Sequence, residues 1–139
     1  MLKVKVLTVG RSKESWLAEA IAEYEKRLQG KLQFEWLIAK DDPQLLQWCK
    51  QEPFLIALDL KGDLVSSEQL SRKLTSLFAV KGSRLAFCIG GPEGLPGELQ
   101  AQWRWCLSPL TFTHQIVRLI LIEQLYRALE IDKGSQYHK

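Results

Sequence analysis

The stretch Phe87-Cys88-Ile89-Gly90-Gly91-Pro92-Glu93-Gly94 decides the fold, because a short apolar run ends there in a loop of glycines, a proline and a carboxylate. This order predicts a buried strand followed by a binding loop, since glycine accepts positive φ and lets a ligand approach the backbone. In open α/β sheets, ligands bind at the carboxyl ends of the strands. The loop has neither the GxGxxG spacing of a dinucleotide fold nor the lysine of a P-loop. On this stretch alone, a cofactor loop and a plain tight turn both remain open.

The composition is that of one soluble domain over residues 1–139, with 46% apolar and 25% charged residues. No apolar run has the length of a membrane span, so we expect a cytoplasmic protein without a membrane partner. Cys49, Cys88 and Cys106 are an odd set without CxxC spacing, which favours small buried residues over a disulfide framework or a metal site.

Basic residues gather towards both ends of the chain, although the net charge is only +3. If the fold brings the two ends together, these residues form a patch for a nucleic-acid backbone; otherwise they are solvated side chains that keep the protein soluble. The residues concerned are Lys3, Lys5, Arg11, Lys13, Lys133 and Lys139.

Strands and helices are predicted to alternate along the chain. The unbroken apolar run of residues 54–58 indicates a strand buried on both faces, as in a parallel sheet. The sequence therefore predicts an α/β fold with a mostly parallel sheet flanked by helices. The expected strands are 3–9, 32–38, 54–58, 85–89 and 103–107, and the expected helices are 16–28, 43–51, 66–78, one that starts at 96–100, and 115–131.

Three local features refine this prediction. Residues 59–62 are expected to form a loop at the end of the third strand. Ser66 and Gln69 have the spacing of a capping box at a helix start. Trp103 and Trp105 share a face of the fifth strand, where packing against a helix is favoured over stacking with a nucleobase.

The last predicted helix, residues 115–131, carries apolar side chains around nearly its whole circumference. One face of a sheet cannot bury all of them, so a second surface must cover the rest. In a chain of this size, that surface is plausibly a second subunit. The pattern therefore predicts a homodimer that uses this helix.

A set of short motifs follows from the third strand to the end of the chain. These are Leu58-Asp59-Leu60-Lys61-Gly62, Ile89-Gly90-Gly91-Pro92-Glu93-Gly94, Leu107-Ser108-Pro109-Leu110-Thr111-Phe112-Thr113-His114-Gln115, Glu123-Gln124-Leu125-Tyr126-Arg127-Ala128 and Tyr137-His138-Lys139. In this order they resemble the ribosomal RNA large subunit methyltransferase H family of the SPOUT superfamily, over the chain from Val4 to the last residue.

The resemblance implies a SPOUT-type fold whose C-terminal part forms a trefoil knot, and a homodimer. It also implies S-adenosylmethionine as the cofactor and methylation of N3 of a pseudouridine in 23S ribosomal RNA, either free or in the assembled ribosome. Knots are essentially absent from proteins in general, so the knot is expected from the resemblance alone.

By the same resemblance, the cofactor contacts fall at three places in the chain. The chemistry agrees, because loop backbone and apolar side chains can enclose an adenine, and a cofactor without phosphate needs no lysine beside the glycines. Gly90 and Gly91 are then expected to permit the close approach of the ligand. The implied contacts are Leu58, Gly90, Leu107, Ser108, Pro109, Leu110, Thr111 and Phe112.

The terminal motif is expected to carry the chemistry. Methyl transfer is an in-line displacement, and the attacking imide nitrogen must lose its proton, which a base with a pKa near neutrality assists. As a hypothesis, His138 assists deprotonation, Tyr137 packs against cofactor or nucleobase, and Lys139 contacts phosphate or the developing charge. Without the resemblance, a polar tail of no function would be the favoured interpretation.

An alternative function is a non-catalytic RNA-binding module of the same fold. A small nucleotide hydrolase is disfavoured, because the chain lacks a P-loop. Thr113 and Gln136 replace residues that are often proline or small in the family, which affects loop rigidity rather than the reaction. For His114, a structural place at a helix start is favoured over a role in the chemistry. Glu93 could orient a substrate amide or cap its turn, and Arg118 and Arg127 could reach across a dimer towards the cofactor or RNA or form structural ion pairs.

Overall fold

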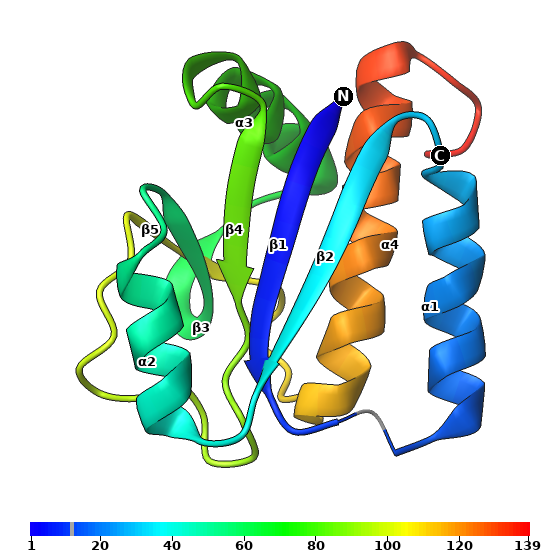
Figure 1. Cartoon of the computed structure of the whole chain (residues 1–139). Coiled ribbons are helices and arrows are strands. Elements are labelled where there is room, and N and C mark those ends of the chain that lie inside the picture. Colours follow the sequence, from blue (N-terminus) through cyan, green and yellow to red (C-terminus); the bar gives the residue numbers. More distant parts are fainter. Residues whose placement is uncertain (12) are drawn as a thin grey trace.

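A computed structural model describes residues 1–11 and 13–139. Its elements follow one another in the order β1 (Leu2–Val9), α1 (Ser15–Arg27), β2 (Leu32–Ala39), α2 (Asp42–Lys50), β3 (Leu55–Leu64), α3 (Ser67–Val80), β4 (Arg84–Cys88), β5 (Trp103–Cys106) and α4 (His114–Lys133). The strands form one five-stranded sheet in the order β2-β1-β4-β3-β5, and each neighbouring pair is parallel. The predicted α/β fold with a parallel sheet is therefore confirmed (Figure 1).

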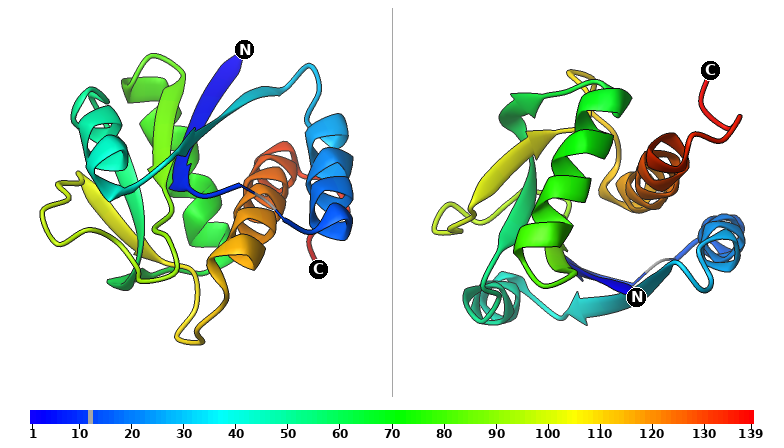
Figure 2. Two further views of the ribbon diagram at one scale, coloured as in Figure 1. Left: turned by 60° about the horizontal axis from the view of Figure 1, so that its bottom comes forward. Right: turned by 90° about the horizontal axis from the view of Figure 1, so that it is seen from above.

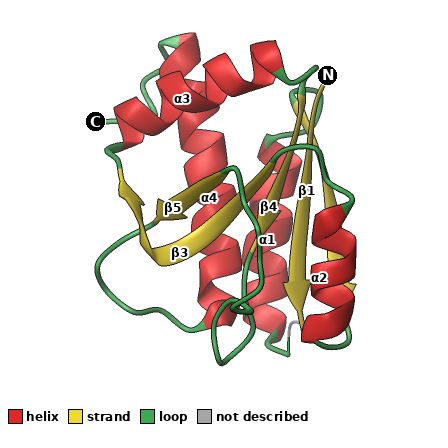
Figure 3. Ribbon diagram, turned by 90° about the vertical axis from the view of Figure 1, so that its left-hand side faces the viewer, coloured by secondary structure: helices red, strands yellow, loops and turns green. Residues whose placement is uncertain are grey.

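Helices cover both faces of this sheet (Figures 2 and 3). On one face, α1, α3 and α4 enclose the larger hydrophobic core, and on the other face α2 closes a smaller one. The alternation of β1 explains this division, since Val4 and Val6 point into the first core and Leu7 into the second. Strand β4 is buried from Leu85 to Cys88, as its continuous apolar sequence requires between two layers of helices.

The expected loop at residues 59–62 is wrong, because β3 continues to Leu64. Leu58 and Asp63 both pair with Trp105, so the four residues between them have no partner on β5 and form a bulge within the strand. A side chain at Gly62 would meet the backbone carbonyl carbon of Arg104 at 2.5 Å, so only glycine permits this contact. The sequence suggested a turn because Asp and Gly are common in bulges and turns alike.

Two side-chain contacts hold the bulge against β5. The carboxylate of Asp59 accepts a hydrogen bond from the Arg104 guanidinium at 2.9 Å, and that of Asp63 accepts one from the Trp103 indole at 2.9 Å. The backbone N–H of Lys61 and the nearby Arg104 lower the pKa of Asp59. These two contacts join residues that are 40 and 45 positions apart in the sequence, so no local sequence pattern predicts them.

The helix expected to start at 96–100 is also wrong. This segment is a turn in which the Leu99 N–H donates to the Pro96 carbonyl, and Leu99 is buried in the second core. A single turn that lies between a proline, a glycine and a strand has too few residues to sustain a helix.

The residues at the ends of α3 and α4 form helix caps that their types explain. Ser66 and Gln69 form the predicted capping box, with both reciprocal hydrogen bonds present. In α4, the Thr113 side chain accepts from the Ile116 N–H, and Gly134 ends the helix with a φ of 78°.

Helix α4 packs between α1 and α3, so three neighbours share its apolar surface: these two helices and the sheet. Part of the surface that suggested a homodimer is thus covered within one chain. The rings of Trp103 and Trp105 stack at 5.8 Å and are 7% and 3% exposed, which rules out stacking with a nucleobase. Within the described residues, none of the helices is long and apolar enough to cross a membrane.

Candidate functional site

The segments expected to hold a cofactor converge at the carboxyl edge of the sheet. Strand β3 lies between β4 and β5, with Ala57 beside Cys88 and Leu58 beside Trp105. Since parallel strands share one direction, Gly90 and Leu107, each just past its strand, reach the same edge as Leu58. The fold therefore brings together three parts of the chain that are far apart in the sequence.

Gly90 is required by the return of its own loop. A side chain there would meet the carbonyl carbon of Gly94 at 2.5 Å and the nitrogen of Leu95 at 2.7 Å. The Gly94 N–H of the same loop donates to the Gly91 carbonyl at 3.0 Å. Positive φ in this loop is confined to Gly94, at 88°. The approach of a ligand to Gly90 stays a prediction beside this structural role.

Residues 107–112 form the other wall of the candidate site. The Ser108 side chain accepts from the Leu110 N–H at 3.0 Å, and the Ser108 carbonyl accepts from the Cys106 thiol at 3.1 Å. These bonds hold the turn while Leu110 remains 67% exposed. An exposed leucine and the half-buried Leu58 at the same edge of the sheet, together with loop backbone, suit the apolar faces and polar edge of an adenine.

The start of α4 is tied to the end of β1 at the same edge. Arg118 is buried and donates to the Val9 and Gly10 carbonyls, and Gln115 donates to the Arg11 carbonyl. Burial lowers the pKa of the Arg118 guanidinium. Arg118 therefore has a structural role within its own chain.

His114 is the first residue of α4, as expected. Its ring nitrogen contacts the Gln115 side chain at 3.2 Å. Burial, together with the positive charges of Arg118 and Lys13, lowers its pKa.

The C-terminal tail folds back onto the far half of α4. The Tyr137 hydroxyl donates to the Glu123 carboxylate at 2.7 Å and lies 3.3 Å from the Tyr24 hydroxyl. Its ring packs edge-on against Tyr126 at 4.8 Å, with the Arg127 guanidinium 4.8 Å from the ring centre. All three tyrosines of the chain thus meet in one cluster, which sequence reasoning missed because its members come from α1, α4 and the tail.

His138 is held by two charged residues. Its Nδ1 lies 3.0 Å from Nη1 of Arg127, and its Nε2 lies 3.4 Å from Oε1 of Glu68 on α3. Because arginine only donates, Nδ1 accepts the hydrogen bond and the proton of a neutral ring lies on Nε2. Arg127 also forms an ion pair with Glu123, one helical turn away, at 2.7 Å.

The tail and the cofactor segments lie at opposite ends of α4 (Figure 1). The helix has 20 residues and is therefore about 30 Å long. From Gly134, the residues up to His138 span at most about 14 Å when fully extended. Within one chain, a fully extended tail therefore ends roughly 15 Å short of the start of α4, which residues 107–112 directly precede. The two sets of predicted site residues do not meet in a single chain.

The basic residues at the chain ends are likewise divided. Lys5 lies in β1 and pairs with Glu52 at 3.1 Å, whereas Arg11 lies beyond the opposite end of that strand. Lys133 lies 4.0 Å from Glu130 near the tail. The six basic residues therefore do not all share one surface, although the two chain ends lie at the same end of the molecule (Figure 1). The described part of the chain also contains no cluster of three or more His, Cys, Asp or Glu side chains able to hold a metal ion.

Comparison with known proteins identifies the family of this chain. A family model described as "Predicted SPOUT methyltransferase" matches residues 2–138. The chain is 54% identical to the ribosomal RNA large subunit methyltransferase H of Protochlamydia amoebophila, with the whole of both chains aligned. It is 39% identical to the protein of the same name from Alkaliphilus oremlandii, over 99% of this chain and 100% of the relative. The chain belongs to the SPOUT methyltransferase family, and within it to the ribosomal RNA large subunit methyltransferase H family.

Proposed function

We propose that this protein transfers a methyl group from S-adenosylmethionine to N3 of a pseudouridine in 23S ribosomal RNA, and does so in the cytoplasm. The observation that carries the proposal is the meeting of Leu58, Gly90 and residues 107–112 at one edge of the sheet. Membership of a methyltransferase family supports it, as do the names of the relatives.

S-adenosylmethionine supplies an electrophilic methyl group on its sulfonium. Leu58, Leu107, Leu110 and Phe112 provide apolar surface for the adenine, and the backbone around Ser108, Pro109 and Thr111 provides donors and acceptors for its edge. Gly90 keeps the opposite loop compact, so that its backbone forms a wall of the same site. This cofactor carries no phosphate, so these segments need no phosphate-binding lysine.

The tail residues act on the RNA base in this proposal. His138 receives the imide proton through Nδ1, the atom that accepts from Arg127 in the present arrangement. The histidine must therefore leave Arg127 before it can act as a base. Tyr137 packs against the base or the cofactor, and Lys139, which is exposed, contacts phosphate.

The reach of the tail supports a homodimer. Because His138 falls short of residues 107–112 of its own chain, a site that uses both needs the tail of a second copy. The partly exposed apolar residues of α4, such as Ile116 and Ile120, offer surface for that contact. Sedimentation at micromolar concentration tests the dimer, and a monomer there would contradict this part of the proposal.

The function is tested by analysing ribosomal RNA from cells with and without this protein. Nucleoside mass spectrometry should find N3-methylpseudouridine only when the protein is present. Purified protein should also methylate one of two substrates, free 23S RNA or the assembled large subunit, and comparing them identifies the true one. Calorimetry with S-adenosylmethionine separates the alternative, since a non-catalytic RNA-binding module shows no binding at millimolar cofactor.

A further inference from the structure

Strand β2 forms an open edge of the sheet. It is the outermost strand, and all eight of its residues pair in register with β1 on one side only. Natural proteins commonly protect such an edge with a proline, a bulge or a lysine in the strand, because its free N–H and C=O groups accept another strand. The sequence of β2, Leu-Gln-Phe-Glu-Trp-Leu-Ile-Ala, contains none of these protections.

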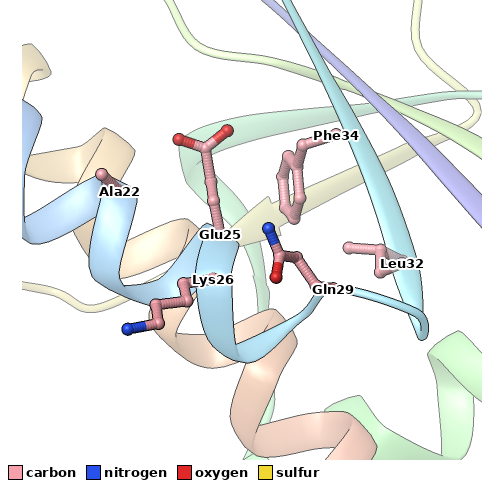
Figure 4. Close-up of a pocket in the computed structure, with 6 residues that line it drawn as sticks. All are labelled: Ala22, Glu25, Lys26, Gln29, Leu32 and Phe34. Carbon is pink, nitrogen blue, oxygen red and sulfur yellow. The ribbon is translucent and has the colours of Figure 1, made fainter.

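A groove follows this edge. Two adjoining cavities of about 380 and 400 Å³ lie between α1 and β2, and Glu25 lines both. Figure 4 shows Phe34 and Leu32 of β2 on one side of the first cavity, and Ala22 and Glu25 of α1 with Gln29 of the following turn on the other. We call the two cavities together the α1–β2 groove.

The strand side of the groove is apolar with a period of two. It consists of Leu32, Phe34, Trp36 and Ile38, whose alternate spacing places them on one face of the strand. The rings of Phe34 and Trp36 stack at 5.8 Å, and both are partly exposed. The helix side includes two small residues, Ala18 and Ala22, which leave room for the side chains of an added strand, together with the larger Ile21, Glu25 and Lys26.

The charges near the middle of the groove indicate the chemistry of its occupant. Glu25 lines the groove, and exposed Glu35 lies at the centre of β2 on its other face. A strand laid along β2 would meet a carboxylate on each of its faces, which favours a lysine or arginine near its centre. Arg11, Lys26 and Arg118 also line the groove, and the Arg118 guanidinium donates to the Val9 and Gly10 carbonyls.

We propose that the α1–β2 groove binds an extended protein segment that adds to β2 as a further strand, with apolar residues facing α1 and a basic residue near its centre. Main-chain hydrogen bonds to the free edge of β2 provide affinity, and the apolar period of the groove selects the register. Free main-chain groups along β2 and an apolar period of two suit an extended peptide, so the occupant is a protein partner of the enzyme rather than its RNA substrate.

The test uses a fluorescein-labelled peptide of about eight residues, matched to β2, in which valine alternates with lysine. Fluorescence anisotropy should show saturable binding, and hydrogen exchange should show protection of alternate β2 amides. N-methylation of alternate peptide amides should weaken binding at least about tenfold, because it removes the edge hydrogen bonds. Equal binding of the methylated peptide, or none at millimolar concentration, would overturn the proposal.

A matched pair of variants tests the carboxylate. Glu25→Gln should weaken peptide binding about tenfold, whereas Glu19→Gln, on an exposed position of the same helix outside the groove, should leave it unchanged. Equal effects of the two variants would contradict a specific groove. Protection of the same β2 amides by single-stranded RNA, but not by the peptide, would overturn the assignment of a protein segment.

Discussion

Tyr137 and Glu123 form a 2.7 Å hydrogen bond that ties the end of the chain to the middle of α4. The bond places the tail near Tyr24 of α1 and Glu68 of α3, so three helices hold it. In this arrangement the proposed base, His138, is engaged by Arg127 and Glu68. The tail must therefore be released before it can act, and its anchoring competes with its function.

Tyr137→Phe is expected to weaken the anchor without removing its packing. The substitution deletes the hydrogen bond to a carboxylate but keeps the edge-on contact with Tyr126. The cost is about 1 kcal/mol, since the site is partly exposed, and the melting temperature should fall by about 2 to 4 °C. Tyr24→Phe, which loses only a 3.3 Å contact, is the control and should have a smaller effect. Equal shifts would contradict a dominant Tyr137–Glu123 bond.

Alkaline pH is expected to release the same tail. Burial, together with hydrogen bonds to Tyr24 and Glu123, raises the pKa of Tyr137 above its ordinary value of about 10. The neutral phenol is thus favoured in the folded state, so its stabilisation is complete below pH about 10 and is lost as pH rises through the higher folded pKa. Anisotropy of a probe on the C-terminus should fall in that alkaline range. The Tyr137→Phe protein should lack the transition; if it persists, another group is responsible.

Gly90 and Gly91 are adjacent but should respond differently to alanine. At Gly90 the new methyl group meets the backbone of Gly94 at 2.5 Å, whereas at Gly91 its nearest neighbour is Cβ of Val9 at 3.6 Å. Gly90→Ala is expected to cost about 1 to 3 kcal/mol and to lower the affinity for S-adenosylmethionine. Gly91→Ala should have little effect on either. Denaturant unfolding and calorimetry measure both quantities, and similar losses in the two variants would contradict the steric argument.

Gly62→Ala should affect the cofactor site from a distance. The new methyl group meets the Arg104 backbone at 2.5 Å, so β5 must shift away from the bulge. Residues 107–112 follow β5 directly, and the affinity for S-adenosylmethionine should therefore fall together with stability, the latter by about 1 to 3 kcal/mol. Gly97→Ala, in open space, is the control. Unchanged cofactor affinity in a destabilised Gly62→Ala protein would show that the conformation of the bulge does not affect the cofactor site.

The elements whose sequences contain a local pattern of apolar or capping residues were predicted well. The strand from Leu2 to Val9 alternates, the capping box at Ser66 is local, and the apolar run before Gly90 matches a strand buried on both faces. In each case, neighbours within a few residues determine the conformation. The loop expected at 59–62 was wrong because a distant contact decides it, at Gly62, where the partner is Arg104. The helix expected at 96–100 was wrong because that segment is too short to sustain a helix.

The candidate site was predicted in its parts but not in its arrangement. Motifs identified Leu58, Gly90 and residues 107–112, and the register of the sheet brings them together. The same motifs included His138, yet the length of α4 separates it from them in one chain. The direction and length of a helix determine such a distance, and a list of motifs contains neither.

Mixing two inactive variants tests whether each active site combines two chains. Leu110 is 67% exposed, so Leu110→Asp should abolish cofactor binding while the protein stays folded, and His138→Ala should abolish proton removal. A dimer of one chain of each kind retains one intact site, made from the loop of the His138→Ala chain and the tail of the Leu110→Asp chain. About half of the dimers in an equal mixture are of this kind, so methyl transfer should recover to about one quarter of the wild-type rate.

The control for this experiment is the doubly substituted chain mixed with wild-type protein. Its mixed dimers hold both substitutions on one chain, so each composite site contains one defective part and those dimers are inactive. About one quarter of the dimers are then wild-type pairs, and activity should fall to about one quarter of the wild-type rate at equal total protein. If His138 acted on its own chain, each wild-type chain would stay active whatever its partner. The double variant would then leave about half of the activity, and mixing the single variants would restore none.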